Sequence, residues 1–459
     1  MPTIMTMRGF LTSPPGSPST VVCSIGVTCA AALALPLLSL PAAAAPAGPS
    51  EAGAPGGTRS LPLAPLTRER VLGTAPEQGL YRPNGEHFSL VGVVWDDPDA
   101  ELHGRVQVRT RSAKTRKWSA WQDVETHNAD HGADPGTAER DARRVRGATA
   151  PLWVGDSDGV DVLVRGVSGG VRGGHTVEPG PPLPYGLRLE LVDPGEEAPP
   201  EGVPADAPRT GPHMDAARAA SAANMDIAGF GVLEIPALGR RATERELARL
   251  DGPVRAKPYI GPRPRIVTRR GWGADESLRE RGFVYTKQAK AAFVHHTASG
   301  NKYTCAQAPS VIRSIYRYHV TGMGWRDLGY NFLVDKCGTI YEGRAGGVAK
   351  AVLGAHTRGF NSNSTGIAVI GSYGATKPPG AAVTAIARLT AWKLGLYGAD
   401  PRGKTYLTSG GGNLYPKGKN VRLNVISGHR DGFATECPGK RLYAKLGTAR
   451  SSAARYQGR

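Results

Sequence analysis

Residues 291–296 read AAFVHH, a short apolar run that ends in two histidines. Its length and its β-branched and aromatic members predict a buried strand. Further strands are predicted in the same part of the chain at YNFLVD (330–335), TIYEG (339–343), SNSTGIAVIGSY (362–373) and NVISGH (424–429). Between and after them, helices are predicted at 304–318, 380–397 and 440–446. This mixture of strands and helices predicts an α/β domain with a central mixed β-sheet flanked by helices.

The chemistry of this domain is concentrated in three side chains. His295 ends the first strand, while His429 and Cys437 lie in the segment GHRDGFATECPGK (428–440). Taken alone, Cys437 has three possible fates, which are disulfide formation, nucleophilic attack and metal binding. Two imidazoles and one thiolate are suitable zinc ligands, and three protein ligands leave a fourth position for water. A zinc ion would lower the pKa of that water to about 7 and polarise a carbonyl beside it. Spacing alone is a weak indication, because the ligands match no local zinc pattern.

The cysteine count and the N-terminus together indicate an exported protein. An apolar run at 21–40 follows Arg8 and precedes the small-residue cluster PAAAAPAG, which is the layout of a secretory signal. A retained membrane anchor is the alternative, since the run is about long enough to span a bilayer. Removal of the signal takes away Cys23 and Cys29 and leaves three cysteines. An odd number in an oxidising compartment implies that one thiol is reactive, intermolecular or metal-bound.

Charge narrows the choice of partner. The 459 residues carry a formal net charge of +18. An exported protein without a zinc-finger, helix-turn-helix or RNA-binding signature is not expected to bind nucleic acid. A basic protein outside the cell would be attracted to anionic cell-wall polymers, although an Arg-rich composition without any specific partner explains the charge equally well. No segment after the signal is apolar enough to span a membrane, so the mature form is predicted not to span one.

The region before the α/β domain has a different pattern. Residues 88–193 contain short β-type runs, and several alternate apolar and polar residues, as half-buried strands do. They predict a β-sandwich-like domain. Its tryptophans could stack on sugar rings, but core packing is the commoner fate of such side chains; they are Trp95, Trp118, Trp121 and Trp153. The charged segment 127–147 has no apolar periodicity and is predicted to be a flexible insertion.

Four segments in order resemble the peptidoglycan recognition protein family, which is related to the phage-lysozyme type of N-acetylmuramoyl-L-alanine amidase. They are FVHHTAS (293–299), GWRDLGYNFLVDKCGTIYEGR (324–344), GAHTRGFNSNSTGIAVIGSY (354–373) and GHRDGFATECPGK (428–440). The resemblance covers about residues 265–446 and says nothing about the β-rich region. It implies a secreted zinc (Zn²⁺) amidase that binds peptidoglycan and cuts the bond between N-acetylmuramic acid and the first L-alanine of the stem peptide.

The resemblance also implies roles for individual residues. The metal ligands are His295, His429 and Cys437. Adjacent strand residues point to opposite faces, so only one of His295 and His296 can face the metal, and the resemblance selects His295. Tyr330 matches the catalytic tyrosine of the family, and Thr435 matches a position that is threonine in many members and lysine in the phage-type enzyme. A phenol and a hydroxyl there could orient water or donate a hydrogen bond to the developing oxyanion.

Other residues are expected to line the site or to stabilise the fold. The substrate groove is expected to use His356, Arg344, Asn361 and Asn363, although each has an ordinary structural alternative. Cys305 and Cys337 are expected to form a disulfide, and Glu342 is expected to be a solvated strand residue. After Arg344 this chain reads AGGV, where many family members have a Gly-aromatic pair, so the preferred stem peptide is not defined.

The sequence therefore predicts six segments. They are a signal peptide (1–45), a disordered lead-in (46–79), the β-rich domain (80–194), a Pro/Ala-rich linker (195–264), the zinc amidase domain (265–447) and a disordered tail (448–459). Three functional classes fit them. The first is a secreted zinc amidase, in which all three ligands are used. The second is a peptidoglycan-binding protein that does not cut. The third is a hydrolase in which Cys437 is the nucleophile.

Overall fold

The computed structural model describes most of the chain after residue 55. The described residues are 56–66, 76–82, 84–126, 129–167, 181–196, 212–251 and 258–459. The predicted signal peptide (1–45) lies outside them, as do parts of the predicted lead-in and linker. Among the described helices, none combines the length and the apolar character that crossing a bilayer requires.

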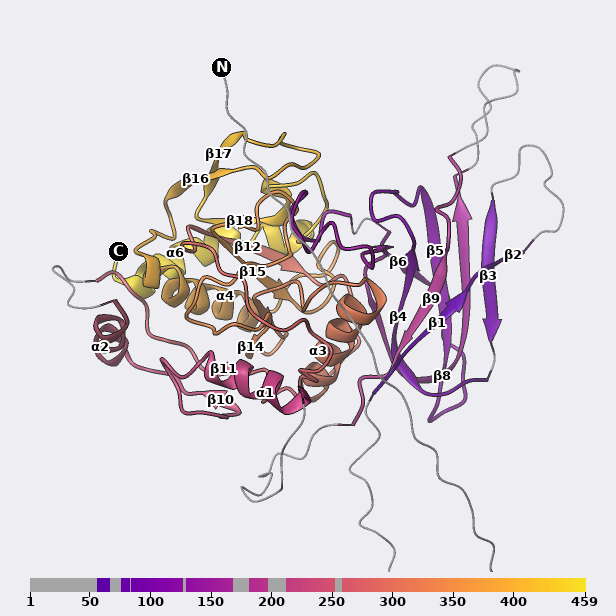
Figure 1. The fold of residues 1–459 in the computed structure, drawn as a ribbon, viewed down its shortest axis with the longest axis horizontal. Helices are drawn as coiled ribbons and strands as arrows, with labels where there is room; N and C mark the ends of the chain where they lie inside the picture. Colours follow the sequence, from indigo (N-terminus) through magenta and orange to yellow (C-terminus); the bar gives the residue numbers. More distant parts are fainter. Residues whose placement is uncertain are drawn as a thin grey trace, which may run out of the picture. The chain divides into compact units, whose positions relative to one another are not determined.

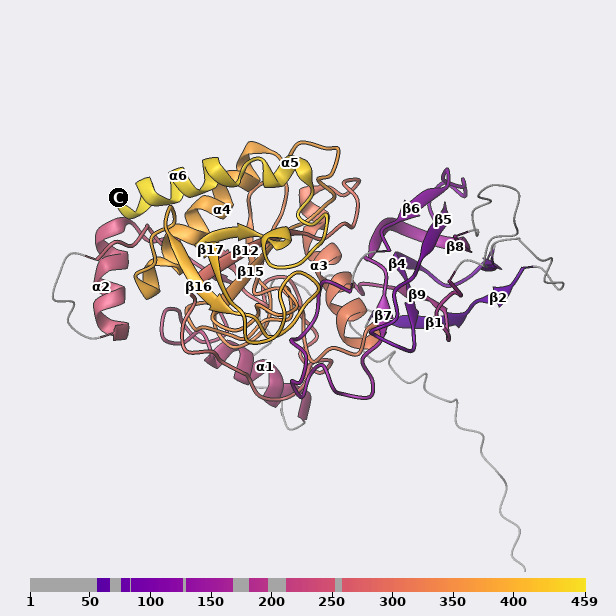
Figure 2. The same ribbon diagram turned by 90° about the horizontal axis from the view of Figure 1, so that it is seen from above.

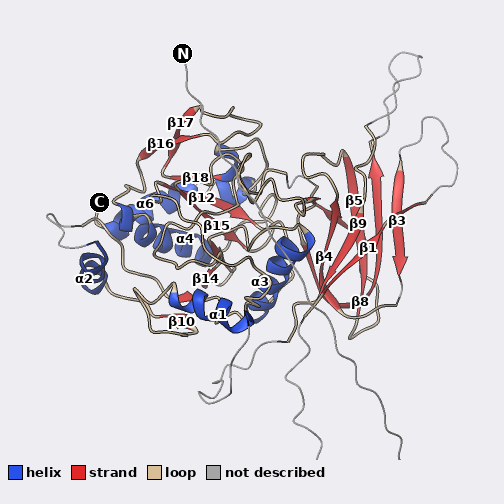
Figure 3. Ribbon diagram, in the orientation of Figure 1, coloured by secondary structure: helices blue, strands red, loops and turns tan. Residues whose placement is uncertain are grey.

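Residues 58–192 form an all-β domain. Its strands are β1 (Thr58–Pro62), β2 (Ala64–Pro65), β3 (Glu77–Arg82), β4 (Phe88–Trp95), β5 (Gly104–Ser112), β6 (Gln122–Val124), β7 (Gly147–Ala148), β8 (Leu152–Gly166) and β9 (Arg188–Val192). The order β1-β9-β4-β8-β3-β2 forms the main path, β5 pairs with β8 and β6, and β7 pairs with β4. The described part of this domain contains strands and no helix (Figure 3).

The core of the β domain follows the predicted alternation. Val106 and Val108 on β5 are fully buried, while the arginines next to them are not. Together with residues of β4, β8 and β9 they form one apolar cluster, which also contains Trp95. Trp153 is buried in a second cluster. Each of these tryptophans therefore stabilises a core and is not available to stack on a sugar.

The β domain begins earlier in the chain than the sequence predicted. The lead-in was expected to be disordered to residue 79, yet β1 pairs antiparallel with β9 and places Leu61 opposite Leu189. The strand was missed because it is only five residues long and is flanked by Gly, Ala and Pro, whose composition is typical of a linker. Pairing with an already buried neighbour, and not intrinsic propensity, stabilises it.

Residues 212–457 form the α/β domain. Its central sheet has the order β10-β11-β14-β13-β15-β12-β18. The strands are β10 (Glu234–Ile235), β11 (Ile266–Val267), β12 (Ala291–His296), β13 (Phe332–Val334), β14 (Ile340–Glu342), β15 (Ser364–Val369) and β18 (Ile426–Gly428). β12 is parallel to both of its neighbours, whereas β13 and β14 are antiparallel. The predicted mixed sheet is confirmed.

Helices cover the two faces of this sheet (Figure 1). The α-helices are α1 (Pro212–Ala222), α2 (Arg240–Asp251), α3 (Ala308–Arg317), α4 (Gly380–Lys393), the short α5 (Lys440–Tyr443) and α6 (Leu446–Gln457). Single turns are η1 (Cys305–Gln307), η2 (Tyr318–Gly322), η3 (Gly395–Tyr397) and η4 (His429–Asp431). A separate antiparallel hairpin is formed by β16 (Lys404–Thr408) and β17 (Asn420–Asn424).

The alternation along β12 decides which way its histidines point. Ala292 and Val294 pack in the cluster formed with α4 and α6, which lie side by side (Figures 1 and 2). Ala291 and Phe293 pack on the opposite face. Since side chains alternate along a strand, His295 shares the face of Phe293 and His296 shares the face of Val294. The two histidines therefore lie on opposite faces of the sheet.

Two segments that were expected to be irregular are part of this domain. The tail (448–459), predicted to be disordered, continues α6, and Gln457 is buried with its side-chain amide donating to the carbonyl of Ala391 at 3.0 Å. The described part of the predicted linker (195–264) forms α1, β10 and α2, and Arg263 donates to the carbonyl of Ile227 at 3.0 Å. Both segments are rich in alanine and arginine, so their helices bury small side chains and show little apolar contrast.

A disulfide joins Cys305, at the start of the first turn before α3, to Cys337 in the turn between β13 and β14. The two cysteines are 32 residues apart in the sequence. Closing a loop of this length lowers the entropy of the unfolded chain and stabilises the fold by about 3.7 kcal/mol in the loop-entropy model.

We predict that Cys305→Ser, Cys337→Ser and the double variant each lose the same free energy of unfolding, about 3.7 kcal/mol. The reason is that either substitution alone already opens the loop. Urea denaturation of the three variants and of the wild type would measure it. Losses that add in the double variant would contradict the loop-closure explanation, and Ser277→Ala, at a serine near the surface, is the control.

Candidate metal centre

Three elements deliver the predicted ligands to one buried point. His295 comes from the end of β12, His429 from the start of η4 directly after β18, and Cys437 from the loop before α5. Because β12 and β18 are adjacent and parallel, their carboxyl ends lie together. The Nδ1 atoms of His295 and His429 are 3.1 Å apart, and the Cys437 sulfur is 3.8 Å from His295 Nδ1.

A fourth side chain, His131, completes the cluster. Its Nε2 atom is 3.9 Å from the Cys437 sulfur, and one ligand atom from each of the four residues lies within 4.8 Å of all the others. His131 belongs to the segment 127–147, which was predicted to be a flexible insertion. The described part of that segment is instead held against the α/β domain. No spacing marks His131 in the sequence, because its three companions are more than 150 residues away.

The remaining nitrogen of each imidazole has a partner outside the cluster. His429 Nε2 lies 3.1 Å from the carbonyl oxygen of Asp130, and His295 Nε2 lies 3.3 Å from the Thr357 hydroxyl. His131 Nδ1 lies 2.9 Å from a carboxylate oxygen of Asp130. Such outer contacts orient an imidazole and fix the nitrogen that carries its proton, which leaves the other nitrogen free to bind a metal.

The donor set fits a zinc ion. Zinc–nitrogen and zinc–sulfur bonds of ordinary length in a tetrahedron separate two nitrogens by about 3.3 Å and nitrogen from sulfur by about 3.6 Å. Three of the distances found here are close to these, namely 3.1 Å between the two Nδ1 atoms and 3.8 and 3.9 Å from nitrogen to the Cys437 sulfur. Burial lowers the pKa of His429 to about 3 and holds the pKa of His295 well below its usual value, so both imidazoles are neutral, as metal ligands must be.

Without a cation the cluster would be poorly stabilised. Burial raises the pKa of the Cys437 thiol well above its usual value, which disfavours the thiolate. A bound cation would reverse that preference, because coordination deprotonates a thiol. The buried sulfur and the three imidazoles are therefore explained better by a metal than by packing alone.

The two expected catalytic residues lie beside this cluster. Tyr330 directly precedes β13, and its ring centroid is 5.5 Å from that of His295 and 5.8 Å from that of His131. The tyrosine is buried, and burial raises the pKa of its phenol above the usual value. Thr435 lies in the loop before α5, where its hydroxyl accepts a hydrogen bond from the backbone N–H of Cys437 at 3.1 Å.

Arg344 and Asn361, two of the predicted groove residues, contact the segment that carries His131. Arg344 donates to both carboxylate oxygens of Glu139 at 2.8 and 2.9 Å, and all of these atoms are buried. The Asn361 amide donates to Asp134 at 2.6 Å and to the carbonyl of Gly132 at 2.9 Å. In this structure their polar groups are thus occupied by the chain itself.

His356 and Asn363, the other two predicted groove residues, are placed differently. His356 is fully buried behind His295, with 5.2 Å between ring centroids, and its Nδ1 lies 3.0 Å from the Thr357 hydroxyl. A Cβ atom on Gly366 would come within 2.3 Å of this imidazole, so the strand needs glycine there. Asn363 adopts a left-handed backbone conformation with φ of 58°, which asparagine tolerates.

Glu342, at the end of β14, is buried and not solvated as expected. Its carboxylate accepts hydrogen bonds from the Asn224 amide at 2.9 and 3.0 Å and from the backbone N–H of Arg269 at 3.2 Å. The strand pattern gave no sign of this, because Asn224 follows α1 in a region that had been taken as a linker. Burial raises the pKa of Glu342 to about 7, although the hydrogen bonds from Asn224 and Arg269 lower it.

Comparison with known proteins divides the chain in two. Residues 285–440 match the family model described as N-acetylmuramoyl-L-alanine amidase. Residues 46–201 match a model described as Rv3811 N-terminal galactose-binding domain-like, which agrees with the predicted sandwich-like domain. The three expected ligands lie in the first match and His131 lies in the second.

Individual relatives match the C-terminal part. Peptidoglycan-recognition protein SC2 of Drosophila simulans is 31% identical over 183 residues, which are 40% of this chain and 85% of the relative. The N-acetylmuramoyl-L-alanine amidase of Homo sapiens is 30% identical over 190 residues, 40% of this chain and 28% of that protein. Among solved structures, wild-type Drosophila PGRP-LB is 27% identical and covers 40% of this chain and 92% of its own, with a TM-score of 0.31.

The buried Glu342 makes stability depend on pH. The folded protein retains this proton up to about pH 7, whereas an unfolded glutamate loses it near 4.5. The free energy of unfolding should therefore fall as the pH rises from about 4.5 to about 7, by at most about 3 kcal/mol from this residue. Urea denaturation across that range would measure the slope. Glu342→Gln does not titrate and should lose this part of the slope, so parallel curves for the two proteins would contradict the assignment.

Proposed function

The chain belongs to the family of peptidoglycan-recognition proteins and N-acetylmuramoyl-L-alanine amidases, and from this premise we propose that it is a zinc-dependent amidase. The proposed substrate is peptidoglycan, and the bond cut joins the lactyl group of N-acetylmuramic acid to the first L-alanine of the stem peptide. The observation that carries the proposal is the convergence of His295, His429 and Cys437 at one buried point with Tyr330 beside them.

The donor residues define what the protein contributes to the reaction. When bound, zinc supplies a Lewis acid and makes water nucleophilic at neutral pH. His295, His429 and Cys437 would hold the ion, and the hydrogen bonds to Thr357 and Asp130 keep the imidazoles oriented. Such orientation limits the reorganisation that the site must undergo during the reaction.

Tyr330 and Thr435 are the proposed groups that handle the proton and the oxyanion. A buried phenol with a raised pKa remains protonated at neutral pH, so Tyr330 can donate a hydrogen bond to the carbonyl oxygen as negative charge develops on it. The Thr435 hydroxyl accepts a hydrogen bond from the backbone N–H of Cys437, and it also interacts with the Asp130 carboxylate. It would donate its proton to the same carbonyl oxygen after turning away from Asp130.

The site argues against a cysteine nucleophile. A nucleophilic cysteine needs a depressed pKa, yet burial raises the pKa of Cys437, and the His295 imidazole 3.8 Å from its sulfur is itself held neutral. A recognition protein that binds peptidoglycan without cutting remains the second candidate. One observation favours it, which is that all four residues of the donor cluster are buried in this structure.

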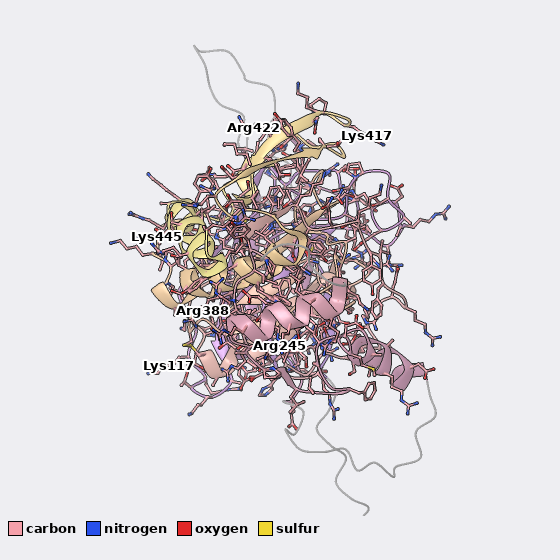
Figure 4. All side chains as sticks on the ribbon, turned by 90° about the vertical axis from the view of Figure 1, so that its left-hand side faces the viewer. Lys117, Arg245, Arg388, Lys417, Arg422 and Lys445 are labelled. Atoms are coloured by element: carbon pink, nitrogen blue, oxygen red, sulfur yellow. A yellow bond between two sulfur atoms is a disulfide. The ribbon has the colours of Figure 1, made fainter. Side chains whose placement is uncertain are left out.

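We further propose that the mature protein acts outside the cell, at the wall. The exposed surface of the α/β domain carries many cations, among them Arg388, Lys417, Arg422 and Lys445 (Figure 4). Together with the net charge of +18, these side chains would attract anionic wall polymers over a long range. Exposed Trp118 and Trp121 on the β domain, both beside Arg109, support a role in sugar stacking there.

The proposed activity requires the metal. Purified sacculi incubated with the zinc-loaded protein should release stem peptides that carry a new N-terminal L-alanine, which mass spectrometry detects. Removing the zinc with a chelator should abolish the release, and adding zinc back should restore it. Release that continues after complete removal of the metal would exclude the zinc mechanism. No release by the zinc-loaded protein or by any variant described below would leave the recognition module as the function.

Substitution of Tyr330 should lower the reaction rate without changing the zinc content. In Tyr330→Phe the loss of the hydroxyl should lower the rate of stem-peptide release about 100-fold, as expected for a positioned proton donor. Zinc content, measured by atomic absorption, should be unchanged. The matched control is Tyr341→Phe, which removes a buried hydroxyl bonded to Asp335 in the same domain. Equal rates for wild type and Tyr330→Phe would contradict the catalytic role.

A further inference from the structure

The segment 129–147, here called the plug, connects β6 to β7 and leaves the β domain to contact the α/β domain. The C-terminal part of the plug is hydrogen-bonded to backbone carbonyls of the α/β domain. The N–H of Arg146 donates to the carbonyl of Met323 at 3.0 Å, and the Arg144 guanidinium donates to the carbonyl of Gly324 at 2.9 Å. Ala133 and Val145 are buried in the cluster that also contains residues of α3. The plug is thus packed and bonded along its length.

The plug presents two carboxylates to the predicted substrate groove. Glu139 forms a buried two-point ion pair with Arg344, and Asp134 accepts hydrogen bonds from the Asn361 amide and the backbone N–H of Gly359. A peptide ligand with free carboxylates would offer the same chemistry to the same side chains. The plug therefore occupies the positions that a stem peptide was expected to take.

Next to these carboxylates the plug delivers an imidazole to the metal centre. Asp130 Oδ1 lies 2.9 Å from His131 Nδ1, which turns Nε2 toward the Cys437 sulfur. The carbonyl oxygen of Asp130 lies 3.1 Å from His429 Nε2. One dipeptide therefore orients both its own histidine and an expected ligand from the other domain.

We propose that His131 is a fourth protein ligand of the metal and that the plug closes the cleft, so that this structure represents a latent state. The inference rests on the proposed function, because it takes the site to be a zinc site. Four protein ligands are typical of structural zinc, whereas catalytic zinc keeps one position for water or substrate. With His131 in place that position is filled.

The side chains at the metal centre are buried, as a closed site requires. His295 and His429 are completely buried, Cys437 is 1% exposed, and Tyr330 is 4% exposed. A cavity of about 450 Å³ lies beside the plug and is lined in part by Asp130 and Thr435, but none of the four donor residues lines it. A polymer as large as peptidoglycan cannot reach the donors without movement of the plug. Withdrawal would open one coordination position and free Arg344 and Asn361 in the same step.

The test uses the full-length protein with cobalt(II) in place of zinc, because the visible absorption of cobalt reports its ligands. Imidazole is added as an external ligand. The wild-type spectrum should not respond, since all four positions are filled, whereas His131→Ala should bind imidazole and shift its spectrum. His131→Ala should also lose metal affinity, by about 10-fold to 100-fold or more in competition with a chelator.

Glu139→Gln is the second variant, because it keeps all four donors and weakens only the ion pair that holds the plug to Arg344. Loss of one partner of this buried ion pair should increase the equilibrium constant for withdrawal of the plug about 10-fold or more. Its cobalt spectrum should therefore respond to imidazole, and its release of stem peptides should exceed that of the wild type by a similar factor. His87→Ala, at an exposed histidine of the same domain that pairs with Asp156, is the control.

The outcomes separate this inference from the proposed function. A wild-type spectrum that responds to imidazole as strongly as that of His131→Ala would overturn the fourth ligand. Equal release by the wild type and Glu139→Gln would overturn the latent state, although the amidase function would stand. Spectra as expected without release by any protein would refute the amidase and leave the closed metal centre intact.

Discussion

The convergence of four ligand atoms within 4.8 Å, in a buried site, is the constraint on which the rest of the structure depends. Burying three imidazoles and a thiol together is unfavourable unless each polar atom has a partner. The protein supplies partners on the outer side of each imidazole, and a cation would supply the partner on the inner side. The parallel pairing of β12 with β18 and the alternation of β12 both serve this arrangement, because they bring His295 and His429 to one edge and turn His296 away.

The α/β domain could be predicted because its local patterns agree with its tertiary structure. AAFVHH is a fully buried strand, and the expected helices at 304–318 and 380–397 correspond to η1 to η2 and to α4 with η3. The ligand set in this domain came from the resemblance, since spacing alone could not join residues 142 positions apart. The helix α6 was missed because its buried face is made of alanines, which resemble a polar tail when contrast in hydrophobicity is the only signal.

The segment 127–147 of the β domain contributes to the metal centre, and this could not be predicted from the sequence. The physical reason differs from the one for α6. The segment 127–147 is charged and aperiodic, and its order comes from partners in the other domain. Glu139 is stabilised by Arg344, Asp134 by Asn361, and His131 by the cluster. Each of these pairs spans more than 150 residues of sequence. A loop whose structure depends on such contacts has the same composition as a disordered segment. Only its tertiary contacts distinguish an ordered loop of this kind from a disordered one.

The position of His131 also gives the metal a role in the cohesion of the molecule. If one ion takes ligands from both domains, its binding energy and the free energy that holds the domains together become a single linked quantity. Scarcity of metal would then loosen the β domain as well as empty the site. Conversely, a force or a polymer that draws the β domain away would weaken metal binding until the remaining ligands close around the ion. The join between the domains would in this way sense both the supply of metal and the tension on the wall.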